Sequence, residues 1–255
     1  MKDWENLTRK LEFYLRLRTF PVGFKLLEDK TELDNNKWVR RLPHRATLCQ
    51  LVTIVRTFDW TVGATAEELL PPQCTSMIGL SEVPEFVKDG TMRSVIWVKD
   101  KEQGKKCEAA IPRIDPGKYE AVLLAPIVYN PFDPDIIILY ANPAQMCILI
   151  NAIQFDRYER LEFFSSGETS CSDVIAQCYL TGKPSLSIPC YGERRFGHAQ
   201  DDELAIGIPA GDYERIVQNL EILYKRGIRY PISMMGATVN AEPALKMAYN
   251  LPEMK

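Results

Sequence analysis

Short apolar runs constrain the fold of this chain more than any other feature. They read VGFKLLE (22–28), DWTVGAT (59–65), MRSVIWVKD (92–100), KYEAVLLAPI (118–127), DIIILYA (135–141), LEFFSS (161–166), PSLSIPC (184–190) and ELAIGIPA (203–210). Their length and composition predict β-strands. Apolar residues at helical spacing predict helices over 3–17, 46–58, 142–155, 171–184 and 212–227. Strands and helices alternate without a regular βαβ pattern, which predicts an α+β fold with mixed sheets and packed helices.

The domain organisation follows from length and from a repeated cysteine spacing. A chain of 255 residues suits a single compact domain over 1–255. Cys49 precedes Cys74 by 25 positions and Cys147 precedes Cys171 by 24, while Cys107 and Cys190 each precede a strand-ending proline by 19 positions. The cysteines therefore pair as Cys49 with Cys147, Cys74 with Cys171, and Cys107 with Cys190. This spacing predicts an internal duplication with pseudo-twofold symmetry, with halves at about 20–126 and 127–210 followed by a C-terminal helix and tail. The residues between the cysteines match poorly, so coincidence stays the alternative.

Composition and charge exclude several classes of function. The formal net charge is only -3, and no basic stripe interleaved with aromatic residues occurs, so we expect no nucleic-acid binding. The first 17 residues are charged throughout and lack the apolar core of a signal peptide. No apolar run is long enough to span a bilayer, so we expect no membrane insertion and a cytoplasmic protein. Seven is an odd number of cysteines, and thiols stay reduced in the cytoplasm, so we expect no disulfide framework.

Four of the cysteines lie where predicted elements begin or end. They are Cys49, Cys74, Cys171 and Cys190. Thiolates at such positions suit a four-cysteine site, for which a 4Fe-4S cluster is the first candidate and zinc the alternative. The chain has no Cys-x-x-Cys motif, so each ligand would come from a separate element. Of the other three cysteines, Cys147 and Cys178 are predicted to pack in the core, and Cys107 to lie at the surface without a role.

The segment GERRFG (192–197) offers a second kind of chemistry. Arg194 follows a glycine turn and could bind a small anionic ligand, whereas the ordinary alternative is a solvated arginine paired with a nearby acid. Two functional hypotheses therefore stand. The first is a metal- or iron–sulfur-binding redox protein that exchanges electrons with a partner protein. The second is a metal-free small-molecule-binding protein or thiol-dependent enzyme, in which Cys171 or Cys190 has a lowered pKa and Arg194 holds an anion. In a third hypothesis the cysteines are structural, and the chain is an accessory or assembly partner of another protein.

An ordered set of short motifs over roughly residues 10–235 carries a resemblance to a known family. The motifs are LCQ (48–50), C-x-x-x-I-G-L (74–80), PRIDPGKYEAVLLAPI (112–127), NPAQ (142–145), G-x-x-x-C (167–171), YLTGKP (179–184), IPCYGERRFG (188–197) and DDELAIGIPA (201–210). In this order they resemble the prokaryotic domain-of-unknown-function family 169. The resemblance implies that Cys49, Cys74, Cys171 and Cys190 occupy motif positions, and it implies no activity.

Overall fold

A single antiparallel sheet organises the protein, whose computed structural model describes residues 2–129 and 132–249. Its strands are β1 (Val22–Leu27), β2 (Val62–Thr65), β3 (Ala121–Pro126), β4 (Ile136–Ala141), β5 (Ser185–Ser187) and β6 (Leu204–Pro209). Their order across the sheet is β2-β3-β1-β4-β6-β5, and every neighbouring pair is antiparallel. The predicted α+β class is confirmed.

Helices and short helical turns connect the strands. The helices are α1 (Trp4–Leu15), α2 (Thr31–Asp34), α3 (Leu48–Phe58), α4 (Pro72–Met77), α5 (Glu85–Lys88), α6 (Thr91–Ser94), α7 (Lys101–Ala110), α8 (Pro143–Gln154), α9 (Gln177–Thr181), α10 (Tyr191–Phe196), α11 (Tyr213–Lys225) and α12 (Glu242–Tyr249). Three further turns are η1 (Ala66–Glu68), η2 (Ile127–Tyr129) and the π-helical η3 (Ser172–Ala176). Within the described ranges, none of these helices has the length and apolar character needed to cross a membrane.

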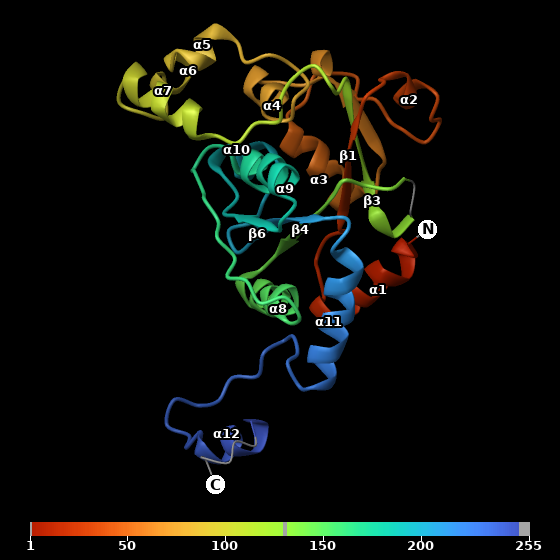
Figure 1. The fold of residues 1–255 in the computed structure, drawn as a ribbon, viewed down its shortest axis with the longest axis vertical. Coiled ribbons are helices and arrows are strands. Elements are labelled where there is room, and N and C mark those ends of the chain that lie inside the picture. The colour runs from red at the N-terminus through yellow and green to blue at the C-terminus, as the bar shows by residue number, and fades with distance from the viewer. Residues whose placement is uncertain (1, 130–131, 250–255) are drawn as a thin grey trace.

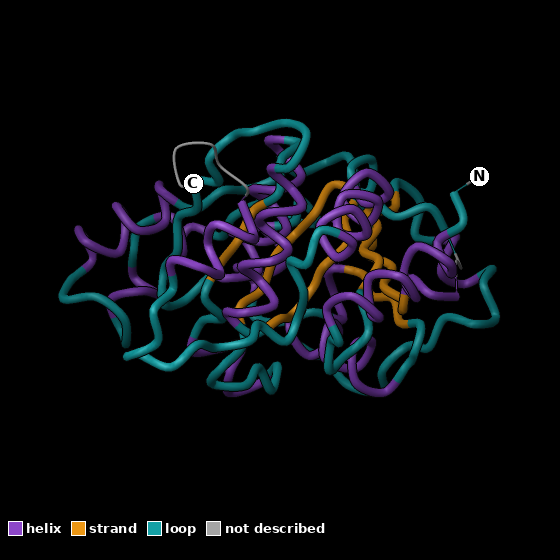
Figure 2. Tube along the Cα trace, turned by 90° about the horizontal axis from the view of Figure 1, so that it is seen from below, coloured by secondary structure: helices purple, strands orange, loops and turns teal. Residues whose placement is uncertain are grey.

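Both faces of the sheet are covered by helices (Figure 2). In β4, alternate side chains enter different cores: Ile136, Ile138 and Tyr140 point to the first face, and Ile137 and Leu139 to the second. The first core includes residues of α3, α4, η3 and α9, and the second includes residues of α1, α8 and α11. Burial on both faces explains why the strands read as apolar runs, since neither face needs polar residues.

Capping residues set where two of the central helices begin. Thr47 caps α3 and Gln50 returns a hydrogen bond to its backbone, which completes a capping box. Asn142 and Gln145 form the same arrangement at α8, as the predicted cap at Asn142 requires. The two helices share this start although they cover opposite faces of the sheet.

Helices α5, α6 and α7 form a lobe beyond one end of the sheet (Figure 1). Arg93, with 0% of its side chain exposed, pairs there with Glu108 and Glu168. The strand predicted over 92–100 is therefore wrong, because this segment is helix α6 followed by turns. The strand predicted over 161–166 is also wrong, since that segment has no regular structure.

The strand order bears on the predicted duplication. From one edge the order is β2, β3, β1, and from the other edge it is β5, β6, β4. The order is therefore symmetric if β1, β2 and β3 correspond to β4, β5 and β6. A twofold axis normal to the sheet would also keep matched helices on the same face, yet α3 and α8 lie on opposite faces. The strands agree with the symmetry and these helices do not, so the duplication stays a prediction.

Candidate functional site

Four cysteines come from the first turns of four separate helices on one side of the sheet. Cys49 is the second residue of α3, and Cys74 is the third residue of α4. Cys171 starts the helical segment that runs through η3 and α9, and Cys190 is the residue that caps α10. We call these four residues the four-thiol site. Each of these cysteines thus lies at or near the start of a helical segment.

The pKa shifts of two of these cysteines include contributions from the others. The pKa of Cys171 is raised well above its ordinary value, by a hydrogen bond with the Cys74 thiol, by burial, and by negative charge on Cys74, Cys190 and Cys49. Burial raises the pKa of Cys49 to about 12, with further contributions from Glu193, Cys74 and Cys190. Cys74 and Cys171, which are far apart in sequence, therefore contact each other directly, and Cys49 and Cys190 act on Cys171 through their charge.

Cys74 differs from the others in its pKa. The hydrogen bond from Cys171 lowers the pKa of Cys74 despite burial, and the backbone N–H of Leu48 and the charge of Arg93 lower it further. Cys74 is therefore the thiol most easily deprotonated in this pair. This differs from the predicted lowering at Cys171, whose pKa moves in the opposite direction because it donates the hydrogen bond to Cys74.

Backbone packing holds Cys49 against the turn that carries Cys190. The Cys49 sulfur lies 4.0 Å from the carbonyl oxygen of Gly192 and 3.0 Å from the hydroxyl of Thr47. A side chain at Gly197 would place its Cβ 2.9 Å from the Cβ of Cys49, so α10 approaches α3 this closely only because residue 197 is glycine. The spacing between the Cys49 and Cys190 elements is thereby fixed.

A buried carboxyl group lies beside the thiols. Glu193, which is 4% exposed, accepts hydrogen bonds from the hydroxyls of Tyr140 and Ser170. Ser170 in turn accepts a hydrogen bond of 3.1 Å from the backbone N–H of Cys190. Burial raises the pKa of Glu193, and these two hydrogen bonds and the charge of Arg56 act against the rise. The network orients the Cys190 turn and places an acidic group next to the site.

The remaining cysteines lie outside this cluster. Cys178 is 1% exposed in the core, as predicted. Cys147 is exposed on α8, so its predicted place in the core is wrong: the core-facing residues of this helix are Met146, Ile148 and Leu149. Cys107 is half-buried on α7 against the first core, rather than at the open surface.

The guanidinium of Arg194 is held by backbone carbonyls. Its Nε donates to Pro189 at 3.1 Å and its Nη1 to Gln200 at 2.7 Å, and Asp201 lies 3.8 Å away. These contacts close the loop after α10. The anion-binding role of Arg194 stays a prediction.

The spacing of the sulfurs limits which metal centre they suit as they stand. A tetrahedral zinc site brings its four sulfurs to about 3.8 Å of one another, given Zn–S bonds of about 2.3 Å. Within the part of the chain that the structure describes, no group of three or more His, Cys, Asp or Glu side chains has an arrangement that could hold a single metal ion. The described residues therefore hold no preformed site for a single ion.

Sequence reasoning missed the buried partners of the thiols. Glu193 reads as one charge among several in YGERRF, and Tyr140 reads as the end of an apolar strand. The available signal is the position of Glu193 one helical turn after Cys190, which puts both at the same end of a helix. Without the neighbouring strand, nothing in the sequence indicates that this end is buried.

Comparisons with known proteins define the family. The family model for DUF169, described as "Uncharacterised ArCR", matches residues 10–219, and the chain belongs to this family. One relative is the uncharacterized protein MJ0308 of Methanocaldococcus jannaschii, which is 25% identical over 220 residues, or 85% of this chain and 93% of the relative. No solved structure matches the chain.

Proposed function

We propose that the four-thiol site binds a 4Fe-4S cluster and that the protein works in electron transfer or redox chemistry. The observation that carries this proposal is the position of Cys49, Cys74, Cys171 and Cys190 at the starts of four separate helical segments, where the Cys49 sulfur lies 4.0 Å from the carbonyl oxygen of Gly192 in the turn that follows Cys190. Four cysteine thiolates are the usual ligands of such a cluster.

The chemistry of the donor set supports a soft metal centre. Thiolates select iron–sulfur clusters, zinc or copper(I) over magnesium and calcium, which prefer oxygen ligands. In a cluster each sulfur binds its own iron, so the sulfurs stand farther apart than around one zinc ion. Zinc stays the alternative centre for the same four thiols.

The surroundings of the site suit an anionic cluster. Arg93 acts on Cys74 through its charge, and Arg56 and Arg194 act on the neighbouring Glu193. Thr47 lies within hydrogen-bond distance of the Cys49 sulfur. Hydrogen bonds to the sulfurs and nearby cations stabilise a reduced cluster and raise its potential.

Partial exposure gives the site a route for electrons. Cys74 and Cys190 are buried, whereas Cys49 and Cys171 are half-buried. A bound cluster supplies one-electron transfer, and this chain holds it close enough to the surface for exchange with a partner protein. The buried side of the site, with Glu193 and Tyr140, limits the access of water.

The proposal is tested by purifying the full chain without oxygen and measuring iron, acid-labile sulfide, zinc and visible absorbance. We expect about four iron and four sulfide per chain and a broad absorbance near 400 nm, as is usual for this cluster type. Serine at position 49, 74, 171 or 190 should lower the iron content sharply. Cys147→Ser and Cys178→Ser are matched controls and should retain it.

Distinct outcomes separate the alternatives. One tightly bound zinc per chain without sulfide would keep the four-thiol ligand set and remove the redox role. A folded chain that gains neither metal on anaerobic reconstitution with iron and sulfide would contradict the proposal. Equal iron loss in Cys147→Ser and Cys49→Ser would show that the ligands are assigned incorrectly.

A further inference from the structure

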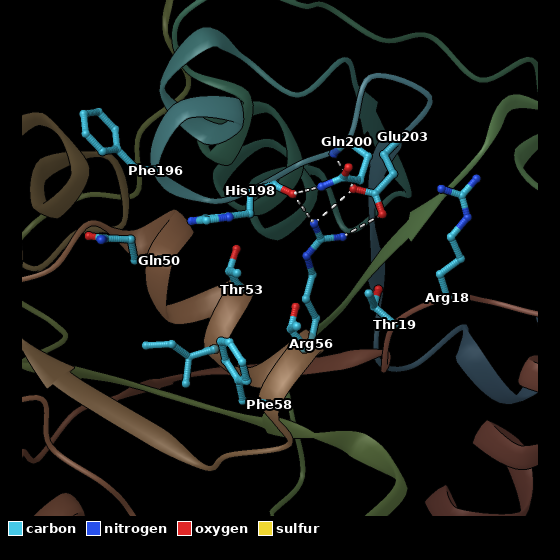
Figure 3. A pocket seen from close by; sticks show the side chains of 12 residues that line it. Arg18, Thr19, Gln50, Thr53, Arg56, Phe58, Phe196, His198, Gln200 and Glu203 are labelled. Atoms are coloured by element: carbon cyan, nitrogen blue, oxygen red, sulfur yellow. Dashed lines mark hydrogen bonds and ion pairs between the residues drawn. The ribbon is translucent and has the colours of Figure 1, made fainter.

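A cavity of about 400 Å³ lies between α3 and the segment that leads from α10 to β6. Figure 3 shows Thr53 and Arg56 on α3 along one wall, Arg18 and Thr19 along a second, and the loop with His198 and Gln200 along a third. Its volume lies at the small end of the range for ligand pockets. The sequence analysis identified no site here.

The wall formed by residues 196–200 is held in place by α3. Thr53 donates its hydroxyl hydrogen to the carbonyl of Gly197, and Arg56 donates to the carbonyl of His198 at 3.3 Å. His198 adopts a left-handed backbone conformation with a φ of 52°, which is uncommon for residues other than glycine. The hydrogen bonds to both carbonyls fix this turn, so the cavity is formed before any ligand binds.

A buried guanidinium forms the base of the cavity. Arg56 is 3% exposed, makes two hydrogen bonds of 3.0 Å with Glu203, and stacks 3.9 Å from the ring centre of Tyr140. Its Nε is buried without a partner among the described residues, and so is the hydroxyl of Thr19. Buried polar groups in this state are uncommon, and both belong to the lining of the same cavity.

The charge and polarity of the lining indicate the class of ligand. Two cations, Arg18 and Arg56, line the cavity, and Arg56 is paired with the lining carboxylate of Glu203. Arg18 lies at the rim, where 53% of its side chain is exposed and where it pairs with Asp202. Phe58 and Ile54 supply an apolar side. Guanidinium groups match carboxylates with two parallel hydrogen bonds.

We propose that this cavity binds a small organic carboxylate, whose charged group pairs with Arg18 and whose apolar part lies against Ile54 and Phe58. The ligand competes with Asp202 for Arg18, because the same guanidinium edge serves both carboxylates. This site is separate from the four-thiol site and does not rest on the cluster proposal.

The two sites are nevertheless connected through buried contacts. Arg56 stacks on Tyr140, Tyr140 donates to Glu193, Glu193 accepts from Ser170, and Ser170 accepts from the backbone of Cys190. In addition, Gln50 lines the cavity and follows Cys49 directly. A residue that lines the cavity is therefore adjacent on α3 to a residue of the four-thiol site.

The test uses benzoate, benzamide and inorganic phosphate with the full chain, by isothermal titration and by amide chemical shifts. Benzoate should bind with a Kd of about 1 mM or tighter, as expected for a ligand of its size. It should shift the amide signals of Thr53 and Gln200. Benzamide, which has the same shape without the charge, should bind about tenfold more weakly.

Variants at the rim test the position of the charge. Arg18→Gln should weaken benzoate binding by about tenfold, and Asp202→Asn should tighten it by removing the competing carboxylate. Arg9→Gln removes another exposed, ion-paired arginine and should change nothing. Four results would each overturn the proposal. Two concern benzoate itself: no binding at 10 mM, which is about tenfold above the expected Kd, or unchanged binding by Arg18→Gln. The other two are binding of benzamide as tight as that of benzoate, or tighter binding of phosphate.

Discussion

Glu203 and Asp202 are neighbours in sequence that pair with arginines in opposite environments. Glu203 is 5% exposed and binds the 3% exposed Arg56 through two hydrogen bonds of 3.0 Å. Asp202 binds Arg18 at the surface, with side-chain exposures of 51% and 53%. Glu203→Gln removes the carboxylate that is hydrogen-bonded to the buried charge of Arg56, whereas Asp202→Asn leaves Arg18 in water. The two substitutions remove the same charge, so burial alone separates their effects.

Magnitudes follow from this difference. Loss of one partner from a buried pair costs about 3–5 kcal/mol of unfolding free energy, and loss of an exposed pair costs about 0.2–1 kcal/mol. At about 2–4 °C per kcal/mol for a chain of this size, Glu203→Gln should lower the Tm by roughly 6–20 °C. Asp202→Asn should lower it by less than about 4 °C. Urea unfolding and thermal scans by circular dichroism measure both, and equal Tm values for the two variants would refute the reasoning.

Three further predictions concern the lobe, the pH dependence and the free thiols. Gly104→Ala would place a Cβ 2.3 Å from the carbonyl oxygen of Gly90, so it should make the α5–α7 lobe more sensitive to limited proteolysis, while Gly211→Ala, with open space around it, should not. Glu68 is partly desolvated, yet hydrogen bonds from Arg41 and Thr65 lower its pKa below the ordinary 4.5. The contribution of this carboxylate to stability is therefore present above about pH 4.5 and lost as the pH falls further. Glu68→Gln should make the Tm depend less on pH in that range. A profile unchanged by that substitution would contradict the assignment. Exposed Cys147 should react with iodoacetamide in the folded protein and Cys178 only after unfolding, as peptide mass spectrometry can show; rapid native labelling of Cys178 would contradict its placement in the core.

Much of the fold was predictable because burial and periodicity agree in most elements. Helices α3 and α11 and strands β1, β3, β4 and β6 coincide with apolar patterns of the expected period. The prediction fails where burial and polarity disagree. In 92–100 the charged Arg93 is fully buried by two glutamates, while Val95 and Ile96 are exposed, so the alternating pattern that predicts a strand is misleading.

The site was predictable in part. Position at element ends, together with the family motifs, selected Cys49, Cys74, Cys171 and Cys190; Cys74 and Cys171 are hydrogen-bonded, and the role of the four as ligands stays a prediction. The cavity at Arg56 was not predictable, because its lining comes from residues 18–19, 50–58 and 196–203, and only the packing of α10 against α3 joins them. Helix α10 itself was missed, since Gly192 and its length of six residues hide the helical pattern.

The metal content of the chain purified without oxygen tests the central claim most directly. The account predicts about four iron and four sulfide per chain, lost in Cys171→Ser and kept in Cys147→Ser. A well-folded chain that stays free of iron and sulfide after anaerobic reconstitution would contradict it.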